Sequence, residues 1–331
     1  MKINSLFYEN SMDNVICKLC PRECFIKPGN SGYCKVRKNI DGDLYSMNYG
    51  NITAFSVDPI EKKPLYHYKP GYDIASFGSW GCNLGCPYCQ NSEITKKIPE
   101  VKKNLRPDSL NTILKKYDIE CIAFTYSEPV VWYEFILDSL REIKNGDNIY
   151  YTVLVTNGYI NPEPWNLILQ YTDAVNIDLK SFNAEKFRNI FDGDIEVIKR
   201  NIEKAYERGV HTELTTLVVP GINDNISELE EEFKWIGSIS ETIPLHLSKY
   251  YPRYEYTKPS TDEGFLIEMY NTAKKYLKHV YLGNFWDSKY QSTYCSYCGN
   301  EIIERNGYNV KLKNINKSGG CNSCGKTEII I

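Results

Sequence analysis

The sequence has no run of about twenty consecutive apolar residues, so we expect no membrane-spanning helix. It also lacks an excess of basic side chains: 39 Lys and Arg against 42 Asp and Glu give a formal net charge of −3. This balance argues against a general electrostatic grip on nucleic acid or on an acidic membrane. Residues 1–10 carry neither the basic lead nor the apolar segment of a signal peptide. We therefore expect a cytoplasmic protein.

Cysteine, in contrast, is abundant. The 331 residues include twelve cysteines, which fall into groups spaced like metal ligands. Such groups in a long chain indicate metal sites rather than the disulfide framework of a small secreted protein. The groups are Cys17, Cys20, Cys24 and Cys34; Cys82, Cys86 and Cys89; and Cys295, Cys298, Cys321 and Cys324. The twelfth, Cys121, is expected to be a buried apolar side chain without chemistry.

The middle group lacks a fourth cysteine. Cys82, Cys86 and Cys89 are separated by three and then two residues on one short segment. A closed cluster or structural zinc site takes four protein ligands, whereas a catalytic metal keeps one position open. Three thiolates would leave one iron of a [4Fe–4S] cluster without a protein ligand. The alternative is three buried or zinc-bound cysteines.

This spacing, with the aromatic Tyr88 directly before Cys89, resembles the cluster motif of the radical S-adenosylmethionine (SAM) superfamily. The resemblance implies that SAM chelates the fourth iron and that one electron from the cluster cleaves it to a 5′-deoxyadenosyl radical. It also implies that Tyr88 lies near the adenine of SAM. The expected cofactors are a [4Fe–4S] cluster and SAM, with a reductant such as flavodoxin or ferredoxin as a partner.

The region from residue 73 to about 286 alternates short apolar runs with longer helical patterns, which predicts parallel βα units. The expected fold is α/β, a partial (βα)6 TIM-like barrel (the radical SAM fold), with its site at the carboxyl ends of the strands. Pro107 marks the start of one helix, and apolar residues at 195, 198, 202 and 205 predict another. The predicted strands are residues 73–78, 121–126, 150–156, 174–179, 211–219 and 244–247, with a possible addition at 279–282.

We expect three parts in the chain. Residues 1–72 form a Cys-rich N-terminal segment without clear periodicity, residues 73–288 the partial barrel, and residues 289–331 a zinc-ribbon-like domain. Within the first part, residues 58–68 mix charged and aromatic residues, which in isolation indicates an ordinary surface arm.

Polar residues stand at the ends of the predicted strands, where side chains face the mouth of such a barrel. Glu128 occupies the position of the superfamily's Gly-Gly-Glu motif, although the two glycines are replaced here. That resemblance implies that its carboxylate holds the SAM amino group. Alternatively, Glu128 and Pro129 form an ordinary helix N-terminus.

The next two strand ends carry Thr156 and Asn157, and then Asp178 and Lys180. Asp178 and Lys180 are two residues apart, so their side chains point to the same face of a strand. These runs resemble glycyl-radical activating enzymes, in which the matching residues contact the SAM carboxylate and ribose. The alternative for Asp178 and Lys180 is an exposed ion pair. His246, at the end of the sixth strand, either contacts SAM or substrate or is structural.

The C-terminal group forms two CxxC knuckles, each followed by glycine and separated by 22 residues. This pattern predicts a structural zinc ribbon, with an auxiliary iron–sulfur cluster as the alternative. The N-terminal group is less regular and leaves three alternatives open, namely zinc, a second cluster or free thiols.

Four features together resemble the radical SAM protein of the AmmeMemoRadiSam system: the Cys-Lys-Leu-Cys-Pro-Arg run at residues 17–22, the charged segment, the cluster motif and the ribbon. That family in turn resembles pyruvate formate-lyase activating enzymes. The resemblance implies Memo-like and AMMECR-like partner proteins. One departure concerns the activating enzymes, in which an Asp usually precedes the Thr-Asn-Gly of the third strand. Val155 stands there in this chain.

The sequence therefore predicts a radical SAM enzyme that abstracts hydrogen from an unidentified substrate. Two alternatives remain: an activating enzyme for a glycyl-radical partner, and a non-enzymatic zinc protein whose ribbon binds RNA or a protein complex. The last of these leaves the three-cysteine segment and the polar strand ends without a purpose, and the acidic balance does not favour RNA.

Overall fold

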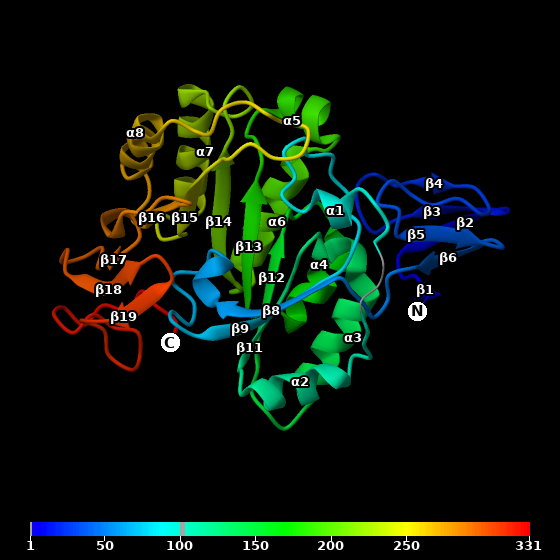
Figure 1. The fold of residues 1–331 in the computed structure, drawn as a ribbon, viewed down its shortest axis with the longest axis horizontal. Helices are drawn as coiled ribbons and strands as arrows, with labels where there is room; N and C mark the ends of the chain where they lie inside the picture. The colour runs from blue at the N-terminus through cyan, green and yellow to red at the C-terminus, as the bar shows by residue number, and fades with distance from the viewer. Residues whose placement is uncertain (1, 100–102) are drawn as a thin grey trace.

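The computed structural model describes residues 2–99 and 103–331 (Figure 1). Its centre is an eight-stranded open sheet in the order β16-β15-β14-β13-β12-β11-β9-β8. β8 pairs antiparallel with β9, and all the other neighbours in this sheet pair in parallel. The strands are β8 (Ala54–Pro59), β9 (Asp73–Gly78), β11 (Cys121–Thr125), β12 (Tyr151–Thr156), β13 (Ala174–Leu179), β14 (His211–Val218), β15 (Leu245–Lys249) and β16 (Val280–Gly283).

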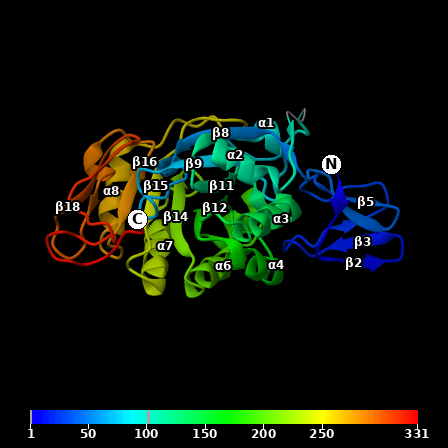
Figure 2. The ribbon, with the colours of Figure 1, turned by 90° about the horizontal axis from the view of Figure 1, so that it is seen from below.

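Helices connect the parallel strands, and most of them pack along one face of the sheet (Figure 2). The α/β class and the mainly parallel sheet are confirmed, and the six predicted strands and the possible seventh lie within two residues of the observed bounds. The helices are α1 (Ser92–Thr95), α2 (Ser109–Tyr117), α3 (Tyr133–Lys144), α4 (Pro162–Ile168), α5 (Ala184–Phe191), α6 (Ile195–Glu207), α7 (Ile226–Ile239) and α8 (Glu263–Ala273), with 3-10 turns η1 (Ile60–Lys62), η2 (Pro129–Trp132), η3 (Leu169–Tyr171) and η4 (Ser288–Tyr290).

Helix α6 illustrates how the sequence specifies these elements. Asp194 caps it by accepting a hydrogen bond from the Glu196 amide at 3.0 Å. Gly209, with φ of +74°, ends the turn that follows. The predicted apolar positions are all fully buried against the sheet: Ile195, Ile198, Ile202 and Ala205.

The N-terminal segment, which has no clear periodicity, consists of two small antiparallel sheets, β1-β6-β5 and β2-β3-β4. These strands are only two to four residues long, too short for an alternating pattern to register in the sequence. They are β1 (Ile3–Asn4), β2 (Tyr8–Ser11), β3 (Asn14–Cys17), β4 (Phe25–Ile26), β5 (Arg37–Ile40) and β6 (Asp43–Ser46); beyond them, β7 (Asn51–Ile52) pairs with β10 (Lys103–Asn104).

The charged and aromatic segment that follows β8 is not the surface arm its composition suggested. Residues 60–69 are mostly buried, with Lys63 only 1% exposed. The backbone amides of Tyr66 and His67 donate to the buried carboxylate of Glu213, which lies on β14. The Glu213 carboxylate and apolar neighbours therefore hold this segment against the sheet. These tertiary contacts offset the free-energy cost of burying its polar and charged groups.

The C-terminal residues form a three-stranded sheet of β17 (Thr293–Tyr294), β18 (Glu301–Asn306) and β19 (Asn309–Leu312). It lies at the opposite end of the molecule from the N-terminal sheets (Figures 1 and 2). The predicted division at residues 72/73 and 288/289 stays a prediction, and its first two parts include residues 1 and 100–102, which lie outside the described structure. Within the described residues, no helix is both long and apolar enough to cross a membrane.

Candidate functional site

A cavity of about 310 Å3 lies at the carboxyl ends of the parallel strands. It brings together residues that are far apart in the sequence, because parallel strands end at the same edge of a sheet. Its lining includes eight of the predicted site residues: Cys82, Cys86, Tyr88, Cys89, Glu128, Asn157, Asp178 and Lys180.

The three cysteines lie on the segment between β9 and α1. Cys82 Sγ accepts a hydrogen bond from the Leu84 amide at 3.5 Å, and Asn157 Nδ2 lies 3.8 Å from the same sulfur. Burial raises the pKa of Cys86 to about 11, although the nearby Lys180 ammonium acts in the opposite direction. Thiols in such a setting ionise when a metal binds them, because only the thiolate is a good ligand.

These thiols fit a cluster with one open iron. Three cysteines line the cavity, and no fourth is among its lining residues within the described structure. The other lining residues include polar side chains from neighbouring strand ends, among them Glu128 and Lys180. This is the donor set for a [4Fe–4S] cluster that leaves one iron to a small ligand.

Glu128 follows β11 and lines the cavity while its carboxylate is held on three sides. Oε1 accepts from Thr156 Oγ1 at 2.6 Å and from the Val130 amide at 3.1 Å, and Oε2 accepts from the Asn157 amide at 2.9 Å. Glu128 therefore caps the 3-10 turn η2, and it also lines the cavity at the predicted site. Oε2 accepts only the bond from the Asn157 amide among the described residues and keeps acceptor capacity for a further donor. Burial raises the pKa of Glu128 to about 7, although these hydrogen bonds act in the opposite direction.

Asp178 and Lys180 form the ion pair expected from their spacing. Lys180 Nζ donates to Asp178 Oδ2 at 2.8 Å, and both side chains line the cavity. They are only partly exposed, at 33% and 17%. Burial alone would disfavour the ammonium, but the carboxylate of Asp178 raises the pKa of Lys180 above its usual value. The pair therefore presents a fixed cation beside Cys86.

Two predicted residues do not line the cavity. Thr156 lies behind Glu128 and contacts it through its hydroxyl. His246 is buried, and its Nε2 lies 2.7 Å from Glu213 Oε2. Its ring packs edge-on against Tyr66 with centroids 4.7 Å apart. These contacts are those expected of a structural histidine, and a contact of His246 with SAM or substrate stays a prediction.

The sequence missed several lining residues, among them Thr215, Leu217, Ser248 and Asn284. One signal could have found Ser248, since it lies two residues beyond His246 on the same strand, nearer the carboxyl end. Lys62 and Pro64 also line the cavity, and nothing in the sequence indicated that their segment folds back over the sheet.

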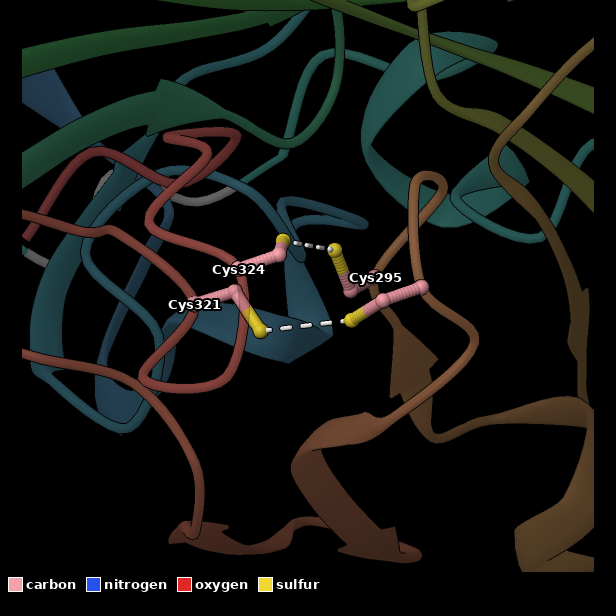
Figure 3. Close-up of side chains that lie close together, drawn as sticks. Cys295, Cys321 and Cys324 are labelled. Atoms are coloured by element: carbon pink, nitrogen blue, oxygen red, sulfur yellow. Dashed lines mark hydrogen bonds between the residues drawn. The ribbon is translucent and has the colours of Figure 1, made fainter.

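The C-terminal cysteines converge as predicted (Figure 3). The Sγ atoms of Cys295 and Cys324 are 3.5 Å apart, and those of Cys298 and Cys321 are 3.7 Å apart. Tetrahedral zinc with Zn–S bonds of about 2.3 Å requires S···S edges of about 3.8 Å. The four thiols therefore fit one metal ion. The N-terminal cysteines Cys17, Cys20, Cys24 and Cys34 line a separate cavity.

A larger cavity of about 590 Å3 lies elsewhere, between β8 and α2. Its lining includes Ile52, Phe55, Phe77 and Tyr117 but no cysteine and no carboxylate. Its described lining residues therefore include no ligand for an iron–sulfur cluster. We assign the functional site to the smaller cavity because that cavity contains the convergent polar groups.

Comparison with known proteins agrees with this assignment. The family model "Radical SAM superfamily" matches residues 79–236. The chain is 36% identical over 335 residues to the uncharacterized protein MJ0808 of Methanocaldococcus jannaschii, covering 99% of each protein. It is 25% identical over 215 residues to the putative glycyl-radical enzyme activating enzyme MJ1227 of the same organism, covering 61% of this chain and 85% of that protein.

Among solved structures, Streptococcus suis SuiB bound to the precursor peptide SuiA matches with a TM-score of 0.50 at 12% identity, covering 67% of this chain and 50% of SuiB. This match concerns the fold alone. The non-enzymatic alternative is set aside, because the matched family and the three-thiol cavity coincide in the same region of the chain. The chain belongs to the radical SAM superfamily of enzymes.

Proposed function

We propose that this protein binds a [4Fe–4S] cluster through Cys82, Cys86 and Cys89, binds SAM at the open iron, and abstracts hydrogen from a substrate at the same end of the sheet. The observation that supports the proposal is the cavity of about 310 Å3 that the three thiols share with Glu128 and Lys180. Its volume falls in the range of about 300–1,000 Å3 that is usual for small-molecule sites. The sheet would be the partial (βα)6 barrel expected from the sequence.

When bound, the cluster and SAM supply reductive cleavage to a 5′-deoxyadenosyl radical and methionine, with one electron from an external reductant such as flavodoxin or ferredoxin. The protein's own groups position SAM. Glu128 keeps acceptor capacity on Oε2 for an amino group, and Lys180 offers an ammonium to a carboxylate. Asp178 fixes the direction of that ammonium.

The walls of the cavity support the same role. Tyr88 is 3% exposed and packs edge-on near Phe191 and Tyr250, with ring centroids 6.0 and 6.2 Å away. Leu84 is buried beside it. An apolar wall of this kind limits water near a reactive radical. We assign adenine to the Tyr88 side of the cavity.

We assign zinc to the four C-terminal thiols, because their spacing matches the edges of a zinc tetrahedron rather than a cluster.

Memo-like and AMMECR-like proteins are the partners we propose from the sequence resemblance. The substrate would reach the cavity past Lys62 and Asn284, which both belong to its lining.

An activating enzyme for a glycyl-radical partner is a second candidate. The similarity to the putative activating enzyme MJ1227 favours it. Val155, in place of the Asp found in activating enzymes, argues against a cation site like theirs. The two candidates differ in the substrate of the radical: a glycine loop of a large partner protein in one case and an unidentified molecule in the other.

The proposal is tested by anaerobic reconstitution with iron and sulfide, followed by dithionite and SAM, with 5′-deoxyadenosine and methionine as the assayed products. Wild type should form both products, and Cys86→Ala should form neither. Cys121→Ala is the matched control, since its thiol is fully buried at the start of β11 and outside the cavity. Absence of both products from a wild-type protein that carries its cluster would contradict the proposal.

A further inference from the structure

The four N-terminal cysteines come from different parts of the small sheets but line one small cavity. Cys17 ends β3, Cys20 and Cys24 lie on the turn before β4, and Cys34 lies on the segment before β5. All four line the same cavity, and all four are free thiols. This cavity shares no lining residue with the SAM cavity. We propose that Cys17, Cys20, Cys24 and Cys34 hold a second [4Fe–4S] cluster.

The spacing of these thiols favours a cluster over a single zinc ion. Among the described residues, the group of metal-ligand atoms that all lie within 4.8 Å of one another is the C-terminal set. The N-terminal sulfurs do not all lie within this distance of one another, and neither do those of Cys82, Cys86 and Cys89. A single zinc ion draws four sulfurs to edges of about 3.8 Å, whereas the four irons of a cube hold their thiolates farther apart. Four thiolates also close the cluster completely, unlike the SAM site.

A buried cation points into the same cavity. Arg37 is 1% exposed and lines the cavity. Its Nη1 pairs with Glu134 Oε1 at 2.8 Å, but its Nε and Nη2 have no hydrogen-bond partner in the described structure. Buried N–H donors almost always find an acceptor. The sulfurs of an anionic cluster accept such hydrogen bonds, and the positive charge favours the cluster.

Gly32 has no side chain and so leaves room for the sulfur of Cys24 in this cavity. Gly32 also lines the cavity, and a Cβ placed on it would come within 3.4 Å of Cys24 Sγ. A larger side chain there would crowd the sulfur. Glycine at position 32 therefore leaves space beside the Cys24 sulfur for a bound metal cluster.

The proposed cluster adjoins the loop that holds the SAM cluster. Asn83, which directly follows Cys82, lines the N-terminal cavity, and its carbonyl accepts from Arg22 Nε at 2.6 Å. Gly81 packs so closely on this region that an added Cβ would lie 2.8 Å from the Cys34 carbonyl oxygen. Assembly of the second cluster would therefore fix the position of the loop for the first. This inference goes beyond the proposed function, since the second cluster has no open iron for SAM.

The test uses the full chain with all three SAM-cluster cysteines replaced, C82A/C86A/C89A. After anaerobic reconstitution, this variant should retain about four irons and four sulfides per chain, with zinc at the C-terminal site. Adding Cys20→Ser and Cys34→Ser should abolish the retained iron, whereas adding Cys298→Ser instead should lower zinc and leave iron unchanged. A triple variant without iron, or one whose N-terminal thiols hold a second zinc, would overturn the proposal.

A measurement on the unaltered protein does not depend on the folding of variants. Reduced wild type should show two electron paramagnetic resonance signals, and SAM should perturb only one of them. Total iron should be about eight per chain. A wild-type protein with about four irons and a single signal would contradict the second cluster. The metal count is independent of SAM cleavage, so failure here and failure of the proposed function are distinguishable.

Discussion

Asn157 donates its side-chain amide to Asn83 Oδ1 at 2.9 Å. The bond joins the end of β12 to the segment that carries the cluster cysteines, since Asn83 directly follows Cys82. Asn83 in turn donates Nδ2 to the Tyr159 carbonyl at 2.7 Å and is fully buried. One amide side chain therefore fixes the position of the cysteine loop relative to the strand ends that would bind SAM.

Replacement of Asn83 by Ala should loosen this loop. The change removes the donor to the Tyr159 carbonyl and the oxygen acceptor of the Asn157 amide, and a buried unsatisfied group costs about 1–3 kcal/mol. We expect a lower unfolding temperature and faster loss of the SAM-sensitive paramagnetic signal in the presence of an iron chelator. The exposed Asn148→Ala is the control and should behave like wild type. Unchanged retention of that signal in Asn83→Ala would show that the bond does not hold the loop.

Lys180→Met should weaken SAM binding without loss of the cluster. Lys180 is a partly buried cation in the cavity, and a hydrogen bond to a charged group contributes about 1.5–3 kcal/mol, or roughly 10- to 100-fold in affinity. Equilibrium dialysis of SAM against reconstituted protein measures the effect. Lys186→Met is the matched control, because Lys186 pairs with Glu228 at 3.0 Å outside the cavity. Equal affinities in the two variants would remove Lys180 from the binding site.

Cys324→Ser should release the C-terminal metal and unfold the ribbon locally. The ribbon has a small apolar core, so its folding depends on the metal that its four thiols bind. We expect zinc to fall by about one per chain and the segment after residue 289 to become sensitive to protease. The variant should still cleave SAM, because the SAM cavity lies outside the ribbon. Zinc content equal to that of wild type would show that these thiols are not its ligands.

The sequence predicted the sheet well because its strands are buried on both faces and its helices have clear apolar periodicity. The cluster cysteines and Asp178 with Lys180 could be placed because they lie at or just after the carboxyl ends of parallel strands. These sequence patterns are local, since each involves only a few neighbouring residues. Spacing alone also identified the C-terminal metal site.

The remaining features depend on contacts between distant segments. His246 belongs to a buried network around Glu213, which also receives the backbone amides of Tyr66 and His67. No local pattern connects residues near 66 with residues near 213. The charged segment was therefore expected at the surface, and His246 could not be separated from a ligand of SAM.

Glu232 should make the stability of the protein decrease as the pH rises. It is 1% exposed on α7 and accepts a hydrogen bond from Thr216 Oγ1 at 2.5 Å. Burial raises its pKa to about 8, whereas an unfolded Glu ionises with a pKa near 4.5. Between those values the folded protein binds one more proton than the unfolded chain. The free energy of unfolding then falls with rising pH, by at most about 1.4 kcal/mol per pH unit.

Glu232→Gln removes this proton linkage while keeping a similar shape and a carbonyl acceptor for Thr216. Thermal unfolding measured from pH 5 to pH 8 should therefore show a growing advantage of the variant over wild type, with the two nearly equal at pH 5. Comparison at each pH cancels the contributions of all other titrating groups. Glu231→Gln, at the exposed neighbouring position, should follow wild type throughout. A constant difference between Glu232→Gln and wild type across this range would mean that Glu232 is already ionised in the folded protein, because only a group that changes protonation between the two states produces a slope.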